Sequence, residues 1–187
     1  SGWPIRSVLR IGYAVGMSAD SLPASRLAGV FERRVARALA PLAPSDAPLV
    51  VACSGGADST AAFVAVSRAR VAGAAPVVAA CFDHGLRPSD ETALDRAAVD
   101  AVAERLGREV LHGSVSDLEP SAPESGSEAA AREARYRWLT IACAEAHASH
   151  CVTGHTLDDQ AETVLLRLTR GAGTLGAAAM TADAPWP

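Results

Sequence analysis

Short apolar runs alternate with amphipathic stretches along most of the chain. Four runs have the length and character of buried strands, at residues 48–53, 77–82, 109–115 and 151–153. Apolar residues at helical spacing predict helices at residues 26–42, 58–71, 90–106, 127–147 and 157–169. Strands that alternate with helices of this length form βαβ units. The pattern therefore predicts an α/β fold with a parallel twisted sheet and helices on both faces.

Two predicted helices carry an apolar stripe that indicates which face they bury. In the helix at 26–42 the stripe consists of Leu27, Val30, Phe31, Val35 and Leu39. In the helix at 90–106 it consists of Leu94, Ala97, Ala98, Ala101, Val102 and Leu106. We expect both stripes to pack against the body of the domain.

Length and composition predict one globular domain. The 187 residues suffice for one core of ordinary size. Of the sequence 49% is hydrophobic, but most of this is alanine, and no apolar run is long enough to cross a bilayer. The net charge of −4 argues against a nucleic-acid binder driven by charge alone. We expect residues 1–24 to be an extension or disordered arm, and residues 25–187 to be one domain that is truncated at its C-terminus.

The four cysteines show no metal or redox pattern. Cys53, Cys81, Cys143 and Cys151 include no Cys-x-x-Cys pair. Cys53 and Cys81 fall in predicted buried strands, where a thiol acts as a small hydrophobic group. A reducing, cytoplasmic location is the expectation.

The turn after the first predicted strand is an anion-binding candidate. It reads Ser54-Gly55-Gly56-Ala57-Asp58-Ser59 and leads directly into a predicted helix. Glycines allow a close backbone approach, and the amides of such a turn converge on one point. All 17 basic residues are arginine, so the Walker motif with its lysine is excluded. The alternative is a tight turn that needs glycine for its shape alone.

Polar residues also follow two other predicted strands. Asp83 and His84 come after the second, and Asp158, Asp159 and Glu162 come after the fourth. The carboxyl ends of parallel strands meet at one edge of a sheet, so these groups are expected near the loop. The three acids either complement a helix dipole or hold a divalent cation or an ammonium group.

The long helix at 127–147 adds a basic candidate. Arg132 lies one turn after Glu128, which is the spacing of an ordinary surface ion pair. Its alternative role is to neutralise the charge that develops as pyrophosphate leaves.

Five motifs in this order resemble the catalytic domain of the tRNA(Ile)-lysidine synthetase family, which belongs to the PP-loop ATP pyrophosphatases and has an adenine nucleotide alpha hydrolase-like fold. They are Ser54-Gly55-Gly56-Ala57-Asp58-Ser59, Asp83-His84-Gly85-Leu86-Arg87, Ala131-Arg132-Glu133-Ala134-Arg135-Tyr136, Gly154-His155-Thr156-Leu157-Asp158-Asp159-Gln160-Ala161-Glu162-Thr163 and Arg167-Leu168-Thr169-Arg170-Gly171-Ala172-Gly173. The resemblance covers residues 46–180. The fourth motif is shared in part with related tRNA 2-thiolation enzymes, whose paired cysteines this chain lacks.

The resemblance implies a reaction and a set of roles. Enzymes of this family use ATP to adenylate the C2 carbonyl oxygen of the first anticodon cytidine of tRNA(Ile), and the ε-amino group of free L-lysine then displaces AMP to form lysidine. By resemblance, residues 54–59, with Ala57 among them, hold the pyrophosphate, and Asp58 acts through Mg²⁺. Phe82 and Asp83 border the adenine and ribose, and Arg132 contacts a phosphate. Asp58, Arg132 and Asp158 are the expected catalytic residues.

The acids after the fourth strand are the expected lysine site. By the same resemblance, Asp158, Asp159 and Glu162 attract the lysine ammonium; the residue that takes the proton of the attacking amine is left open.

Other functions fit part of the same pattern. One alternative is another PP-loop ATP pyrophosphatase that modifies tRNA or forms an amide. A second is a non-catalytic ATP-binding α/β module, for which the acids after the fourth strand have no purpose. A membrane partner is not expected, and a homodimer is left open.

Overall fold

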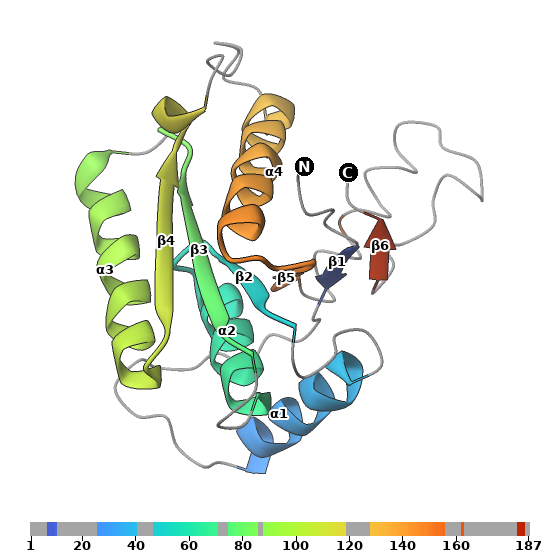
Figure 1. Cartoon of the computed structure of the whole chain (residues 1–187). Helices are drawn as coiled ribbons and strands as arrows, with labels where there is room; N and C mark the ends of the chain where they lie inside the picture. Colours follow the sequence, from blue (N-terminus) through green and yellow to red (C-terminus); the bar gives the residue numbers. More distant parts are fainter. Residues whose placement is uncertain are drawn as a thin grey trace.

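The computed structural model describes residues 7–10, 26–40, 47–70, 75–85, 88–118, 128–155, 162 and 183–185. Strands and helices alternate along most of this part of the chain (Figure 1). The elements are β1 (Ser7–Arg10), α1 (Arg26–Leu39), β2 (Leu49–Cys53), α2 (Ala57–Ala69), β3 (Val77–Asp83), α3 (Ser89–Leu106), β4 (Glu109–Ser114), the 3₁₀ turn η1 (Val115–Asp117), α4 (Glu128–Glu145), β5 (His150–Thr153) and β6 (Asp183–Pro185).

The strands form a single sheet in the order β4-β3-β2-β5-β1-β6. All neighbouring pairs are parallel except β1 with β6, which is antiparallel at one edge. The predicted parallel α/β fold is confirmed, and the antiparallel edge strand adds to it. From β2 the chain moves outward to β3 and β4, and it then returns to β5 on the other side of β2. The carboxyl ends of β2 and β5 therefore flank a topological switch point, the usual ligand position in such sheets.

The first strand lies within the segment expected to be an extension or disordered arm. Residues 7–10 form β1 in the sheet, paired with β5 on one side and β6 on the other. A four-residue segment carries too little pattern to predict a strand by itself. Its pairing satisfies backbone groups of β5 that would otherwise lack a partner on that side.

Two hydrophobic cores cover the two faces of the sheet. Alternate strand residues such as Val51 and Ala79 pack with α1, α2 and α3, around the fully buried Phe63. The intervening residues, such as Val50 and Ala80, pack with α4. Figure 1 shows α3 and α4 on opposite sides of the sheet. Because both faces are covered, the central strands are apolar throughout rather than alternating, as is usual for parallel sheets.

The apolar stripe predicted for the helix at 90–106 is right at its C-terminal end, where Val102 and Leu106 pack against the core, and wrong over the preceding turns. Leu94 is 72% exposed, whereas Thr92, Val99 and Ala103 are buried. The predicted stripe rested largely on alanines, whose burial contributes little free energy, so the larger Val99 decides which face of α3 meets the sheet. In α1 the residues Phe31, Val35 and Leu39 are buried as predicted, while Val30 is exposed.

Among the described helices, none combines the length and apolar character that crossing a bilayer requires.

Candidate functional site

The turn between β2 and α2 is closed by its own hydroxyl groups. The Oγ of Ser59 accepts the backbone N–H of Ser54 at 3.1 Å and donates to the Gly56 carbonyl at 3.0 Å. Its single hydrogen is thereby used, so in the 3.1 Å contact between the Ser54 and Ser59 hydroxyls it is Ser54 that donates. Gly55 has a φ of +84°, a conformation that favours glycine. These hydrogen bonds hold the turn in one conformation without a ligand.

The start of α2 is suited to an anion. Gly56 is its N-cap in an extended conformation, and within the described residues no side chain caps the helix. The first amides of a helix need partners outside it, and the helix dipole favours a negative one. Asp58 lies half-buried in this first turn.

Two neighbouring segments hold the loop tightly. A Cβ atom on Gly55 would lie 2.6 Å from the Cβ and 2.9 Å from the Cα of Asp95 on α3. A Cβ atom on Gly154, just after β5, would lie 2.9 Å from the Asp58 carbonyl oxygen. The loop is thus packed against α3 on one side and against the end of β5 on the other.

Two cavities lie beside this loop. The first, of about 220 Å³, is lined by Ser54 together with Asp83, Thr92, Asp95 and Arg96 from the end of β3 and from α3. The second, of about 110 Å³, is lined by Ser54 and Ser59 together with Arg135, Tyr136, Thr153 and His155 from α4 and the end of β5. Ser54, Phe82 and His84 border both cavities. The loop therefore has one cavity on the α3 side of the sheet and one on the α4 side.

Aromatic packing fixes the wall that the two cavities share. The Phe82 ring meets the His84 ring edge-on at 4.9 Å and lies nearly parallel to the Trp138 ring at 6.5 Å. Trp138 in turn lies against Gly113 of β4, where a Cβ atom would come within 2.4 Å of the indole. Asp83 is oriented by its own turn, because its Oδ1 accepts the Gly85 N–H at 2.8 Å.

Four of the predicted site residues line these cavities: Ser54, Ser59, Phe82 and Asp83. Asp58 belongs to the loop and lies in the first turn of α2. Glu162 is exposed, whereas Asp158 and Asp159 lie outside the described residues.

The basic residues are arranged differently from the expectation. Arg132 is exposed on α4, donates to the Tyr136 hydroxyl at 3.3 Å and lies 4.9 Å from the centre of that ring. It does not line either cavity as described, whereas Arg135 lines the second and Arg96 the first. Sequence reasoning missed Arg96, and it included Arg135 in the motif at residues 131–136 but chose Arg132 as the phosphate contact. The sequence shows only that Arg96 lies two turns into the helix that follows β3, which does not say whether its side of the helix faces the loop.

The thiols beneath the loop are kept neutral by burial. Cys53 and Cys81 are register partners on β2 and β3. Burial raises the pKa of Cys81 to about 11 and raises the pKa of Cys53 well above its ordinary value. The pKa of Cys151 is raised as well, first by its hydrogen bond with Cys143 and then by burial. At neutral pH these groups pack as small hydrophobes and supply no nucleophile.

This burial predicts alkaline destabilisation. Above the ordinary thiol pKa the unfolded chain loses protons that the native chain keeps, so the free energy of unfolding falls as pH rises. For Cys81 the loss should run from about pH 9 to about pH 11, with a slope approaching 1.4 kcal/mol per pH unit. Urea unfolding at pH 8, 9, 10 and 11 measures it. Cys81→Ala should show a shallower slope, and an identical slope in that variant would contradict the assignment.

Comparisons with known proteins place this geometry in a family. A family model described as a PP-loop domain matches residues 27–186. The chain is 43% identical to the tRNA(Ile)-lysidine synthase of Bradyrhizobium sp. (strain BTAi1) over 89% of its own length and 44% of that protein. It is 47% identical to the enzyme of the same name from Salinispora arenicola, over 79% of its own length and 43% of that protein. The chain thus spans less than half the length of these two curated relatives.

A solved structure shares the fold. The U34-tRNA thiolase NcsA from Methanococcus maripaludis, with its [4Fe-4S] cluster, matches 79% of this chain and 52% of its own with a TM-score of 0.64. At 17% sequence identity this likeness shows the fold alone. The loop at residues 54–59, its place at the switch point of the sheet and the match over residues 27–186 agree: the chain belongs to the PP-loop domain family.

Proposed function

We propose that this protein is a tRNA(Ile)-lysidine synthetase, which uses ATP to activate C2 of the first anticodon cytidine of tRNA(Ile) and joins that carbon to the amine of lysine. The observation that carries the proposal is the Ser-Gly-Gly-Ala-Asp-Ser loop, preformed at the switch point and bordered by two cavities. Relatives that are 43% and 47% identical bear this name. Since they are more than twice as long as the matched region, the complete reaction is a proposal for this chain.

The loop is the proposed seat of the pyrophosphate. Its amides and the uncapped start of α2 supply donors for phosphate oxygens, and they are in place before the ligand arrives. The fixed Phe82 ring and the turn at Asp83 offer an apolar wall and a polar edge for adenine and ribose. Ligand binding then aligns the α-phosphate with the RNA base, so that positioning supplies much of the rate acceleration.

Mg²⁺ is the metal that an ATP site of this kind implies. In the described part of the chain no three His, Cys, Asp or Glu side chains cluster as a metal cage. This fits Mg²⁺, which is usually held by one or two carboxylates together with substrate phosphates. Asp58, in the first turn of α2, is the proposed carboxylate. The ion would supply charge neutralisation on the phosphates.

The roles of the remaining predicted residues are proposed from the motifs they occupy. Arg132 is the proposed phosphate contact; it lies one turn before Tyr136, which lines the second cavity. Asp158, Asp159 and Glu162 are proposed to attract the lysine ammonium because three carboxylates follow β5 in sequence. The partners are tRNA(Ile) and free L-lysine, the proposed location is the cytoplasm, and a homodimer is left open.

Assays of the products test the proposal. With ATP and Mg²⁺, formation of AMP and pyrophosphate should require tRNA(Ile), and lysine should be incorporated into the RNA. Asp58→Ala should reduce AMP formation by about 100-fold or more, since removal of one preorganised electrostatic group at a reacting centre has an effect of that size. The control is Glu104→Ala, an exposed acid on α3.

The alternatives give different results in the same assay. Formation of AMP that needs tRNA but not lysine would indicate another PP-loop tRNA-modifying enzyme. Binding of ATP without any AMP formation would indicate a non-catalytic module, and AMP formation that survives in Asp58→Ala would point to a contaminant.

A further inference from the structure

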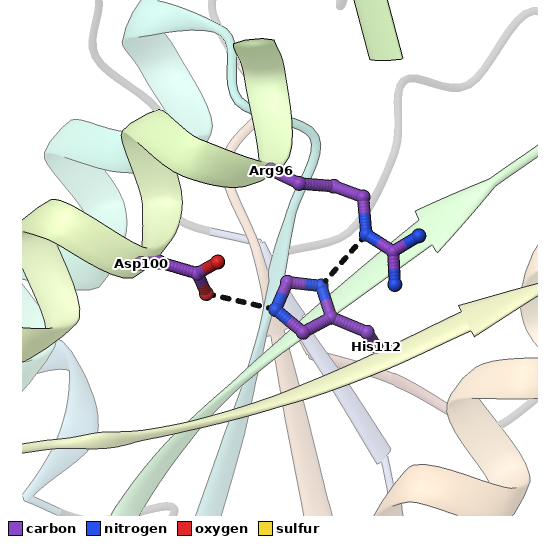
Figure 2. Close-up of polar contacts among 3 residues, drawn as sticks. All are labelled: Arg96, Asp100 and His112. Carbon is purple, nitrogen blue, oxygen red and sulfur yellow. Dashed lines mark hydrogen bonds and ion pairs between the residues drawn. The ribbon is translucent and has the colours of Figure 1, made fainter. Parts of the chain in front are cut away.

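A three-residue cluster links α3 to β4 beside the first cavity (Figure 2). The Nε of Arg96 donates to Nδ1 of His112 at 3.2 Å. On the other side of the ring, Nε2 of His112 is 2.8 Å from Oδ1 of Asp100. Arg96 and Asp100 are one turn apart on α3, and His112 comes from the neighbouring strand. The imidazole is therefore held at both nitrogens by one helix.

The direction of the hydrogen bond from Arg96 determines which nitrogen of His112 carries a hydrogen. An arginine Nε carries a hydrogen and can only donate, so Nδ1 of His112 must accept with its lone pair. In a neutral ring the hydrogen then lies on Nε2, from which it is donated to Asp100. The cluster is a directed chain from Arg96 through His112 to Asp100, and each member orients the one before it.

In this arrangement the two terminal nitrogens of the Arg96 guanidinium point away from the His112 ring. Figure 2 shows the Nε edge of the guanidinium facing His112 and the two terminal nitrogens directed away from it. Those terminal nitrogens carry four of the five hydrogens of the group, in a planar array that matches two phosphate oxygens. Fixing Nε sets the plane of the array and lowers the entropy cost of binding an anion.

Arg96 lies where its terminal nitrogens can meet a phosphate bound at the loop. Arg96 and Ser54 line the same cavity, and Asp95, the preceding residue, packs against Gly55 of the loop. The cavity also holds the carboxylates of Asp83 and Asp95, which repel an anion. Since the chain contains no lysine, an arginine is the side chain that can offset them with a permanent positive charge. Among the described residues Arg96 is the one arginine that lines this cavity.

We propose that Arg96 is a phosphate-binding residue of the nucleotide site, and that His112 and Asp100 are positioning residues that aim its guanidinium at a polyphosphate on the loop at residues 54–59. This rests on the proposed function only in requiring that the loop binds phosphate.

Calorimetry with Mg²⁺–ATP and, separately, with inorganic pyrophosphate tests the contact. Arg96→Gln should weaken both by about 10- to 100-fold, the range expected when charge-assisted hydrogen bonds to phosphate are lost. Arg96→Lys, which keeps the charge but not the planar fork, should give an intermediate loss. The matched control is Arg105→Gln on the exposed side of the same helix, with binding within about twofold of wild type. Thermal melts of each variant establish that it is folded.

The outcomes separate this proposal from the function it rests on. If the wild-type protein binds neither ligand, the proposed function fails. If wild type binds and Arg96→Gln binds equally well, Arg96 is not a phosphate contact, although the proposed function stands.

Variants of His112 test the positioning role. His112→Phe keeps a ring but removes the acceptor, and should weaken pyrophosphate binding by about 3- to 10-fold. His112→Asn places an amide oxygen near the position of Nδ1 and should restore most of the affinity. In the Arg96→Gln background His112→Phe should cause no further loss, because the group it orients is gone. Equal binding by His112→Phe and wild type, or additive losses in the double variant, would overturn the positioning role.

A spectroscopic measurement on the unliganded protein is independent of binding. The ¹⁵Nε–H signal of Arg96, assigned by its absence from Arg96→Gln, should exchange slowly with solvent in wild type and in His112→Asn. It should exchange quickly in His112→Phe. Fast exchange in wild type would contradict the hydrogen bond that anchors the cluster.

Discussion

Gly55→Ala should lower the affinity for Mg²⁺–ATP by about 100-fold or more, since at least two charge-assisted bonds of about 1.5 kcal/mol each depend on the loop's shape. Gly55 has a φ of +84°, and an added Cβ would lie 2.9 Å from the Asp95 backbone and 2.6 Å from its Cβ. Neither atom is the end of a flexible side chain, so the loop itself must move away from α3. Its amides then no longer converge on the ligand. Calorimetry with Mg²⁺–ATP measures the loss.

Gly107→Ala is the matched control for this variant. Gly107 has a φ of +61° at the end of α3, but an added Cβ would meet nothing within 4 Å. The variant should lose about 1 kcal/mol of stability from backbone strain and keep its affinity for ATP. If Gly55→Ala bound ATP within about threefold of Gly107→Ala, the loop geometry would not be the basis of binding.

Phe63→Ala should lower the free energy of unfolding by about 3–5 kcal/mol, the range for truncation of a buried aromatic residue. Phe63 is fully buried on α2, in the core shared by α1, α2, α3 and the sheet. Stabilities of whole domains are about 5–15 kcal/mol, so this is a large share of the total. Urea denaturation followed by circular dichroism measures the change.

Leu94→Ala serves as its counterpart on the surface. Leu94 has a large apolar side chain and is 72% exposed on α3. Its truncation should change the free energy of unfolding by less than about 0.5 kcal/mol. A loss comparable to that of Phe63→Ala would mean that the stripe predicted from sequence, rather than the orientation seen in the structure, describes α3.

Much of the site could be predicted because its chemistry is local in sequence. The loop at 54–59 combines its strand, its glycines and its helix start within a few residues, and the structure has β2 and α2 at this place. The polar residues after β3 could be placed near the loop by a topological rule alone. Arg96 could not, because nothing in the sequence of α3 says which of its faces meets the loop.

The sequence by itself determined the alternation of strands and helices, the parallel α/β fold and the position of the loop at residues 54–59, since each depends on periodicity or on turn chemistry within a short window. Only the tertiary structure decided the place of β1 in the sheet, the rotation of α3 and the choice of Arg96 and Arg135, rather than Arg132, as the arginines that line the cavities. Each of these depends on contacts between distant segments. Strand pairing and the packing of large side chains such as Val99 determine them, and a pattern of alanines and arginines along one helix does not encode that information.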